Sequence, residues 1–328
     1  MKATLTIAHL TDVHLGPIVG FSPRYWNVKR LLGYANWRRN RRDAYGRDVL
    51  DRIVADLKAQ APDHIAVTGD LVNIGLPREH INALAWVESL GAPDAVSVIP
   101  GNHDIYSRLR GDPGTGRWAA YMASCAQGAE HATTGDGAFP FVRMLGRVAI
   151  IGVNSAVPTP PLVASGRVGA EQLARLGATL ERLGRADVFR LVLIHHPPLP
   201  GQATRLRGLT DAAELEAILA QHGAELVVHG HNHRNMLAWR ATPTGALPVV
   251  GAPSAALARP HKTEPLARYN LYRIEGPPWS IELVGRGLEE PGGAIVELER
   301  RMLLPEEGSM RKGHGSREKY SRSQRSQL

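Results

Sequence analysis

Histidines gather in four short stretches of this sequence, and each stretch directly follows an apolar run. Seven of the 14 histidines lie there, namely His14, His103, His195, His196, His229, His231 and His233. If the apolar runs are strands of an open α/β sheet, the loops beyond their carboxyl ends meet at one rim, where such sheets bind ligands. We therefore expect these histidines to converge on one site.

Carboxylates accompany the histidines at spacings that suit a metal site. Asp12 and His14 lie two residues apart in LTDVHLG, so an extended backbone places both side chains on the same side. A carboxylate and an imidazole placed in this way can share a cation. His231 and His233 repeat the spacing in VVHGHNH.

Further oxygen donors follow two other apolar runs. Asp70 ends AVTGD, and IPGNHD offers the amide of Asn102, the imidazole of His103 and the carboxylate of Asp104. Oxygen and nitrogen donors without a thiolate suit Mn, Fe, Zn or Mg better than a soft metal. The donors are also too many for one ion, so more than one metal ion is expected.

The elements that must position these residues are short strands alternating with helices. The predicted buried strands are TLTIAHL, HIAVTGD, AVSVIPG, VAIIGVNS, FRLVLIHH and AELVVHG. Helical patterns lie near residues 44–60, 78–90, 169–184 and 211–222. This alternation predicts an α/β domain with largely parallel pairing. Later strands near 236–241, 247–251, 268–275 and 279–284 add antiparallel pairing, so two packed sheets are expected.

Charge is unevenly distributed over the 328 residues, whose net charge is +8. Residues 24–47 hold eight basic residues and one acid, a local charge of +7, and residues 309–328 carry +5. The remainder therefore carries −4 and provides no continuous track for duplex DNA, which argues against nucleic acid as a partner.

The sequence carries no signal for secretion or for a membrane span. Cys125 is the single cysteine, so an internal disulfide is excluded and a reducing compartment is the default. The N-terminal stretch alternates polar and apolar residues, and no apolar run approaches the roughly 18 residues that a membrane span needs. We expect a cytoplasmic protein.

In the order DVH, GD, GNHD, HHPP and GHNH, five motifs between residues 12 and 233 resemble those of the calcineurin-like metallophosphoesterases. The resemblance implies a four-layer α/β/β/α sandwich of two mixed sheets flanked by helices, which holds two divalent metal ions. By the same resemblance, one ion would bind Asp12, His14 and His233, the other would bind Asn102, His195 and His231, and Asp70 would bridge them. His195 is preferred to His196 because relatives often keep only the first histidine of that pair.

The resemblance also implies a reaction. A dinuclear phosphohydrolase would cleave a phosphodiester or pyrophosphate bond through a metal-bridging hydroxide, with a small molecule or lipid precursor as substrate. His103 would stabilise developing charge or protonate the leaving oxygen, and Asp104 would orient its imidazole. HHPP and GHNH also resemble the class III cyclic-nucleotide phosphodiesterases, which leaves cyclic nucleotides open as substrates. A non-catalytic metal-binding scaffold on the same fold is the alternative from another class.

Residues 21–45 are the most unusual segment of the chain. They make up most of an aromatic and basic insertion at about 18–45, which lies within a predicted domain of residues 1–304. Val28, Leu31 and Leu32 recur there at helical spacing, and Gly33 interrupts them. Three interpretations remain open: a packed cap with a solvated basic face, a clamp for a phosphate-bearing substrate, and a helix that contacts anionic membrane. Substrate contacts are assigned to Arg38, Arg39 and His196.

Residues 305–328 are predicted to form a disordered basic tail, and the sequence leaves the oligomeric state open.

Overall fold

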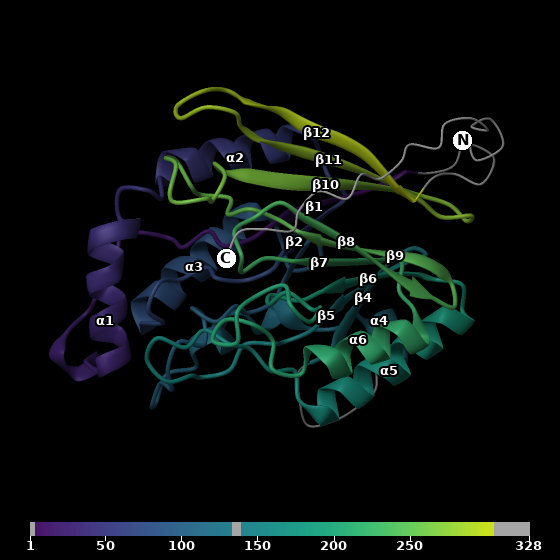
Figure 1. Ribbon diagram of the computed structural model, residues 1–328, viewed down its shortest axis with the longest axis horizontal. Helices are drawn as coiled ribbons and strands as arrows, with labels where there is room; N and C mark the ends of the chain where they lie inside the picture. The colour runs from purple at the N-terminus through teal and green to yellow at the C-terminus, as the bar shows by residue number, and fades with distance from the viewer. Residues whose placement is uncertain (1–3, 133–138, 305–328) are drawn as a thin grey trace, which may run out of the picture.

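Two mixed β-sheets pack face to face between layers of helices in the computed structural model, which describes residues 4–132 and 139–304 (Figure 1). Each sheet has six strands, in the orders β12-β11-β10-β1-β2-β3 and β4-β5-β6-β7-β9-β8. The four-layer α/β fold expected from the sequence is confirmed. The predicted tail at 305–328 lies outside the described residues.

The first sheet joins parallel strands from the start of the chain to an antiparallel group from its end. β1 pairs parallel with β2 and antiparallel with β10, so it lies at the junction of the two groups. The strands are β1 (Leu5–Leu10), β2 (His64–Val67), β3 (Val96–Val98), β10 (Arg268–Glu275), β11 (Ser280–Leu288) and β12 (Ile295–Leu304). Because β1, β2 and β3 are parallel, the loops that follow them leave the same edge of the sheet.

The second sheet is parallel at its centre and antiparallel at both margins. β5, β6, β7 and β9 are mutually parallel, and β4 and β8 pair antiparallel with β5 and β9. The strands are β4 (Phe141–Leu145), β5 (Val148–Gly152), β6 (Phe189–Leu193), β7 (Leu226–His229), β8 (Met236–Thr242) and β9 (Gly245–Gly251). Strand side chains alternate between two apolar clusters: Ile150, Leu191 and Val228 face the first sheet, whereas Val192 and Val227 face the outer helices.

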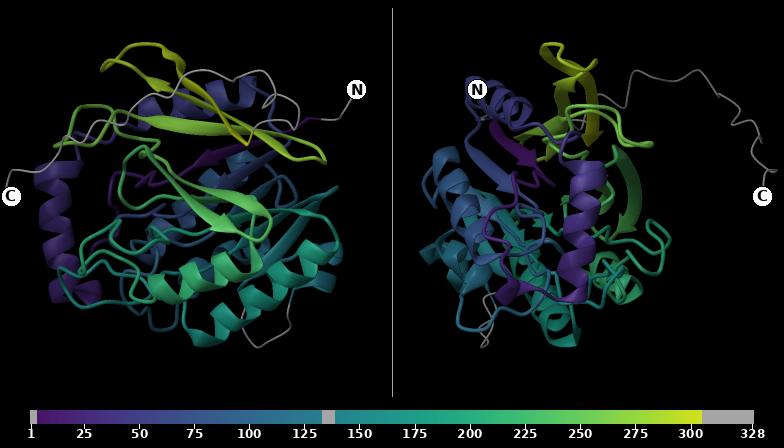
Figure 2. Two further views of the ribbon diagram at one scale, coloured as in Figure 1. Left: turned by 45° about the vertical axis from the view of Figure 1, so that its right-hand side comes forward. Right: turned by 90° about the vertical axis from the view of Figure 1, so that its left-hand side faces the viewer.

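The predicted helices are confirmed as four α-helices that cover the outer faces of the sheets (Figures 1 and 2). α2 (Arg47–Ala59) and α3 (Pro77–Leu90) pack on the first sheet, and α5 (Ala170–Arg185) and α6 (Ala212–His222) on the second. In α5, buried leucines recur at helical spacing and form an apolar stripe against the sheet. Shorter helical segments are η1 (Pro23–Tyr25), η3 (Gly114–Met122) and α4 (Ala126–His131).

β12 has no counterpart among the predicted strands. Its sequence, IVELERRMLL, is exposed or half-buried over most of its length as an edge strand. An edge strand with charged residues on both faces lacks the apolar alternation by which strands are predicted from sequence. Among the described residues, no helix is long and apolar enough to cross a bilayer.

The insertion forms helix α1 (Val28–Asn36), continued by a π-helical turn, η2 (Trp37–Arg41), that stands at one end of the molecule (Figure 2). Gly33 does not interrupt the helix as the sequence suggested. It is the point of close contact with the body of the protein, where an added Cβ would lie 2.2 Å from Tyr106 Oη. That hydroxyl donates a hydrogen bond to the carbonyl of Lys29 (3.2 Å) and so holds α1 in place.

Gly33→Ala should loosen α1, because the new methyl group would displace the Tyr106 hydroxyl from its position against the helix. Limited trypsin digestion should then cut within residues 24–47 several-fold faster than in the wild type. Gly116→Ala in η3 is the control, since its Cβ would make only an ordinary contact, 3.4 Å from Pro113 Cβ. Equal digestion rates for both variants would show that Gly33 does not determine this packing.

Candidate metal centre

The loops that follow five parallel strands bring the predicted ligand residues to one edge of the two sheets. The loops after β1, β2 and β3 come from the first sheet, and those after β6 and β7 from the second. All seven predicted ligands are buried there: Asp12, His14, Asp70, Asn102, His195, His231 and His233. The structure therefore brings together residues that are up to 221 positions apart in the chain, as the contact between Asp12 and His233 shows.

Five of these residues have backbone torsions that L-residues rarely adopt. The φ angles are 53° for Asp12, 41° for His14, 56° for Asp70, 69° for His231 and 52° for His233. Backbone hydrogen bonds between loops hold them, including those from the amides of Asp12 and His14 to the carbonyls of Gly69 and Asp70, both 3.0 Å. Strained torsions of this kind concentrate at functional sites, where the surrounding structure stabilises them.

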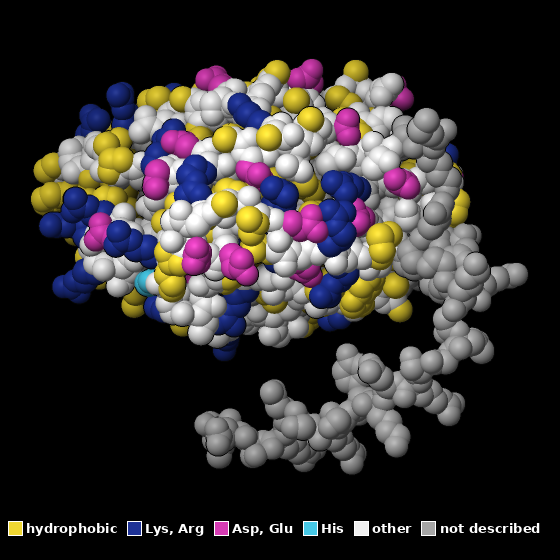
Figure 3. Space-filling view, turned by 90° about the horizontal axis from the view of Figure 1, so that it is seen from above, with side chains coloured by type: hydrophobic (Ala, Val, Ile, Leu, Met, Phe, Trp, Pro, Cys, Tyr) yellow, Lys and Arg dark blue, Asp and Glu magenta, His cyan; other side chains and the backbone are white. Residues whose placement is uncertain are grey.

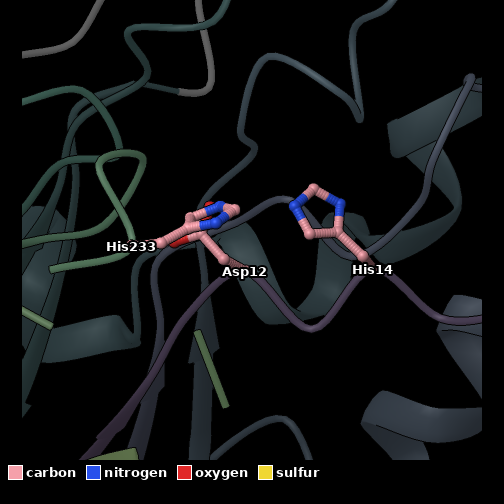
Figure 4. A group of neighbouring side chains, drawn as sticks. All are labelled: Asp12, His14 and His233. Carbon is pink, nitrogen blue, oxygen red and sulfur yellow. The ribbon is translucent and has the colours of Figure 1, made fainter. Parts of the chain in front are cut away.

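One group of candidate metal ligands consists of Asp12, His14 and His233, whose side chains converge (Figure 4). Asp12 Oδ1 lies 3.1 Å from His233 Nε2, while Asp12 Oδ2 accepts hydrogen bonds from Thr11 Oγ1 (2.7 Å) and the His231 amide (2.9 Å). His14 Nδ1 donates to the carbonyl of Val72 (3.2 Å), which leaves the lone pair on Nε2. The contacts of Asp12 and His14 thus fix which atom of each faces the centre.

A second group of candidate metal ligands consists of Asn102, His195 and His231. His195 Nδ1 donates to the carbonyl of Thr68 (2.7 Å), so the neutral imidazole has its lone pair on Nε2. Asn102 Oδ1 lies 3.2 Å from that Nε2 and 2.8 Å from His231 Nδ1. One amide oxygen and two imidazole nitrogens therefore meet at one position.

The carboxylate of Asp70 lies between the two groups. Its Oδ2 is 3.8 Å from His14 Nε2, and its Oδ1 is 3.5 Å from His195 Nε2. The backbone amide of His103 donates to Oδ1 (2.8 Å) and orients the carboxylate. Residue 101 must be glycine here, because a Cβ would lie 2.2 Å from Asp70 Oδ1.

These donors fit two divalent metal ions, whose identity the donor set leaves open. The possible ligand atoms of Asp12, His14 and His233 lie within 4.8 Å of one another, as do those of Asp70, His195 and His231. The buried His14 Nε2 has no hydrogen-bond partner among the described residues. A buried polar atom without a partner is unfavourable unless a ligand satisfies it. Mn, Fe, Zn and Mg remain compatible with oxygen and nitrogen donors.

Electrostatics in the centre favour cation binding. Burial opposes ionisation of Asp70, but His195 and His103 outweigh it and hold the pKa of Asp70 well below its usual range. Burial, together with Arg41, keeps the pKa of His14 well below its usual range, so this imidazole is neutral. Burial would also lower the pKa of His195, yet the charge of Asp70 raises it to about 9. An ionised carboxylate and a neutral imidazole are the forms that bind metal, and binding at His195 would release a proton.

Asp104 does not orient the imidazole of His103 as expected from the sequence. The Asp104 carboxylate instead accepts backbone hydrogen bonds from Asp70, Leu71 and Gly101 at 2.8 Å and from Val72 at 3.1 Å. His103 Nδ1 contacts the carbonyl of Asn73. Asp104 therefore holds the loop that carries Asp70, and the backbone of Asn73 orients His103.

The three predicted substrate contacts, Arg38, Arg39 and His196, do not line the cavity over the metal centre. Arg38 and Arg39 are exposed, and the cavity over the centre is lined by Arg41 and Arg207 but by neither of them. His196 is fully buried beside His195, where its Nδ1 contacts Ser155 Oγ (2.8 Å) and its Nε2 donates to the carbonyl of Ala164 (3.2 Å). His196 thus supports the loop structure below the cavity.

Two residues that the sequence did not indicate contact His233. Glu264 Oε2 lies 2.9 Å from His233 Nδ1, and Tyr45 Oη lies 3.1 Å from the same nitrogen. A carboxylate on the outer nitrogen of a ligand histidine fixes its tautomer and increases its basicity. Neither residue belongs to a motif, and each reaches His233 from another part of the chain. Motif spacing therefore carries no signal for either contact.

Asp104→Ala should lower the free energy of unfolding by at least about 3 kcal/mol, because it leaves several buried amides without an acceptor. Chemical denaturation followed by circular dichroism measures this loss. Asp51→Ala, which breaks only an exposed pair with Arg47, should cost less than about 1 kcal/mol. A similar small loss in both variants would show that Asp104 does not hold the loop.

Comparison with known proteins identifies the family of this chain and relatives of its fold. A sequence relative from Synechococcus, named a probable cyclic nucleotide phosphodiesterase, is 28% identical over 208 residues, which are 62% of this chain and 69% of the relative. A dimetal phosphatase from Danio rerio shares the fold with a TM-score of 0.60 at 14% identity, over 92% of this chain and 98% of that one. A purple acid phosphatase from yellow lupin gives 0.52 at 12% identity, over 94% of this chain and 55% of that one. The family model for calcineurin-like phosphoesterases matches residues 5–235, and the chain belongs to this family of metal-dependent phosphoesterases.

Proposed function

We propose that this protein is a dinuclear metal-dependent phosphohydrolase that cleaves a phosphodiester or pyrophosphate bond in a small molecule or lipid precursor. The observation that carries the proposal is the position of Asp70, whose two oxygens face the two separate donor groups. A carboxylate in this position can bridge two cations. Two bound divalent ions would supply charge neutralisation for the phosphoryl oxygens and a water acidic enough to attack phosphorus.

Arg41 and His103 form the cavity wall that would contact the reacting phosphate. Arg41 Nη1 lies 3.2 Å from His103 Nε2, and since a guanidinium only donates, this nitrogen is the acceptor. The carbonyl of Asn73 only accepts, so His103 carries its proton on Nδ1. In this tautomer His103 has no proton on Nε2 to give to the leaving oxygen. The contact supports instead a role for His103 in positioning the Arg41 guanidinium, which would stabilise the phosphoryl charge.

Further cations around the cavity support a substrate with more than one charged group. Arg207 and Lys262 line the cavity together with Arg41. Arg207 is positioned by a hydrogen bond from its Nη2 to the carbonyl of His231 (3.2 Å). Guanidinium groups recognise phosphate oxygens through paired hydrogen bonds, so a second phosphate or a flanking anionic group fits this wall.

Two alternatives rest on separate observations. The name of the Synechococcus relative favours a cyclic nucleotide as the diester. A non-catalytic scaffold is disfavoured because all seven ligand positions are present and converge. A cytoplasmic location stays a prediction.

The substrate class can be tested with chromogenic esters. With Mn²⁺ added, bis(p-nitrophenyl) phosphate should be hydrolysed at least about tenfold faster than p-nitrophenyl phosphate, as release of p-nitrophenolate will show. Nucleotide-diphosphate lipids and cyclic nucleotides, assayed next, separate the pyrophosphate and cyclic diester hypotheses. Preference for the monoester would contradict the proposed bond type, and no hydrolysis of any substrate would favour the scaffold.

The roles of His103 and Asp70 can be separated by metal content. His103→Ala should keep two ions per chain and lose turnover by about 100-fold or more, because the group that positions Arg41 is gone. Asp70→Ala should lose both turnover and bound metal, since the shared carboxylate is absent. Elemental analysis and bis(p-nitrophenyl) phosphate hydrolysis provide the two readouts. Two ions retained in Asp70→Ala would exclude the bridge, and wild-type turnover in His103→Ala would remove His103 from the mechanism.

A further inference from the structure

Helix α1 has its polarity reversed relative to an ordinary surface helix. Lys29 and Arg30 are its buried residues. Its aliphatic residues Val28, Leu31 and Leu32 face outward, with exposed fractions of 63%, 44% and 46%. A surface helix of a soluble protein normally buries its apolar face and exposes its charged face.

Polar contacts of the two buried cations fix this orientation. Lys29 Nζ donates to Thr159 at its carbonyl (3.0 Å) and its Oγ1 (2.7 Å), and lies 4.5 Å from the centre of the Tyr106 ring. The Arg30 guanidinium donates to the carbonyls of Ile74 (3.2 Å) and Gly75 (3.0 Å). Turning the helix to bury its leucines would break these contacts and leave buried carbonyls without donors. The outward orientation of the apolar face is therefore determined by the contacts of Lys29 and Arg30.

Exposed aromatic and basic side chains extend this face. Trp26, just before α1, is 55% exposed. Arginines also exposed in the same segment are Arg24, Arg38, Arg39 and Arg42, against one acid, Asp43. Figure 3 shows Lys and Arg side chains beside exposed hydrophobic ones at the end of the molecule that holds α1. We call Trp26, Val28, Leu31 and Leu32 with these four arginines the α1 face.

We propose that the α1 face docks on a bilayer that contains anionic phospholipid. Leucine and valine can enter the acyl boundary, tryptophan prefers the headgroup level, and arginine binds lipid phosphates. Each arginine near an anionic surface strengthens binding by about fivefold at moderate salt. Several arginines and an apolar cluster together supply the two signals that stable peripheral binding requires.

Charge argues against a second copy of the chain as the occupant. A symmetric dimer through this face would place each α1 face against its own copy. The four arginines of one copy would then lie close to those of the other, which is unfavourable. An anionic surface is complementary to the same arrangement.

Docking through this face would also place the cavity near the lipid headgroups. Asn36 ends α1, and Asn40 and Arg41 belong to η2, which continues it; all three line the cavity over the metal centre. Access of a lipid-linked phosphate to that cavity is a consequence that rests on the proposed function. The docking itself does not depend on the activity.

Vesicle flotation of the full chain tests the docking. The probes are vesicles of phosphatidylcholine and phosphatidylglycerol in equal parts, and vesicles of phosphatidylcholine alone. One variant combines Trp26→Ser, Leu31→Ser and Leu32→Ser. Its matched control combines Trp239→Ser on β8 with Met302→Ser on β12, which removes exposed apolar side chains outside segment 21–45.

The wild type and the control should float with anionic vesicles and stay behind with neutral ones, and the triple-serine variant should lose at least about tenfold in bound fraction. Arg38→Ala, Arg39→Ala and Arg42→Ala together should reduce binding similarly and weaken its dependence on salt. Hydrolysis of bis(p-nitrophenyl) phosphate without vesicles should be equal in the wild type, the triple-serine variant and the control. This assay separates a failure of docking from a failure of the proposed function.

Three outcomes would overturn the docking. The wild type could fail to float, or the triple-serine variant could float as well as the wild type. The third outcome is a wild-type dimer in analytical ultracentrifugation that becomes a monomer in the triple-serine variant, without vesicle binding by either. That result would assign the α1 face to contact between copies of this chain.

Discussion

The buried negative charge of Asp70 is the constraint on which the rest of the site depends. A carboxylate excluded from water is stable only with donors or cations around it. Here the His103 amide donates to the carboxylate, and His195, whose pKa this charge raises to about 9, lies 3.5 Å from it on a loop of the opposite sheet, so the charge connects the two halves of the sandwich. Divalent cations between the same groups would meet this requirement and at the same time attract phosphate.

A second layer of carboxylates stabilises the loops by accepting hydrogen bonds from backbone amides. Asp104 accepts the amides that surround Asp70, and Glu79 accepts those of Asn73, Ile74 and Leu76. Through Asn73, whose carbonyl contacts His103, this layer also sets the tautomer of that imidazole. The precision of the site therefore depends on backbone amides that short loops leave without partners in the sheets.

The insertion that carries α1 links the site to the surface. Its inner side contributes Arg41 and Tyr45 to the centre, where Arg41 contacts His103 and Tyr45 contacts His233. Its outer side exposes leucines and arginines because buried cations determine which way the helix faces. One segment thus contributes to the cavity wall and to the α1 face, which would couple the proposed hydrolysis to the proposed membrane docking.

The sequence by itself predicted the two-sheet fold, most core elements and the residues that meet at the centre, because strand ends and motif spacing are local signals. It could not identify Arg41, Arg207 or Glu264, nor the true contacts of Asp104 and His196. Those depend on which loops approach each other in the folded chain, as Arg41 approaches His103 across 62 residues and Glu264 approaches His233 across 31. The outward face of α1 was likewise decided by tertiary contacts, since helical spacing defines an apolar stripe but not whether it turns toward the core or toward solvent.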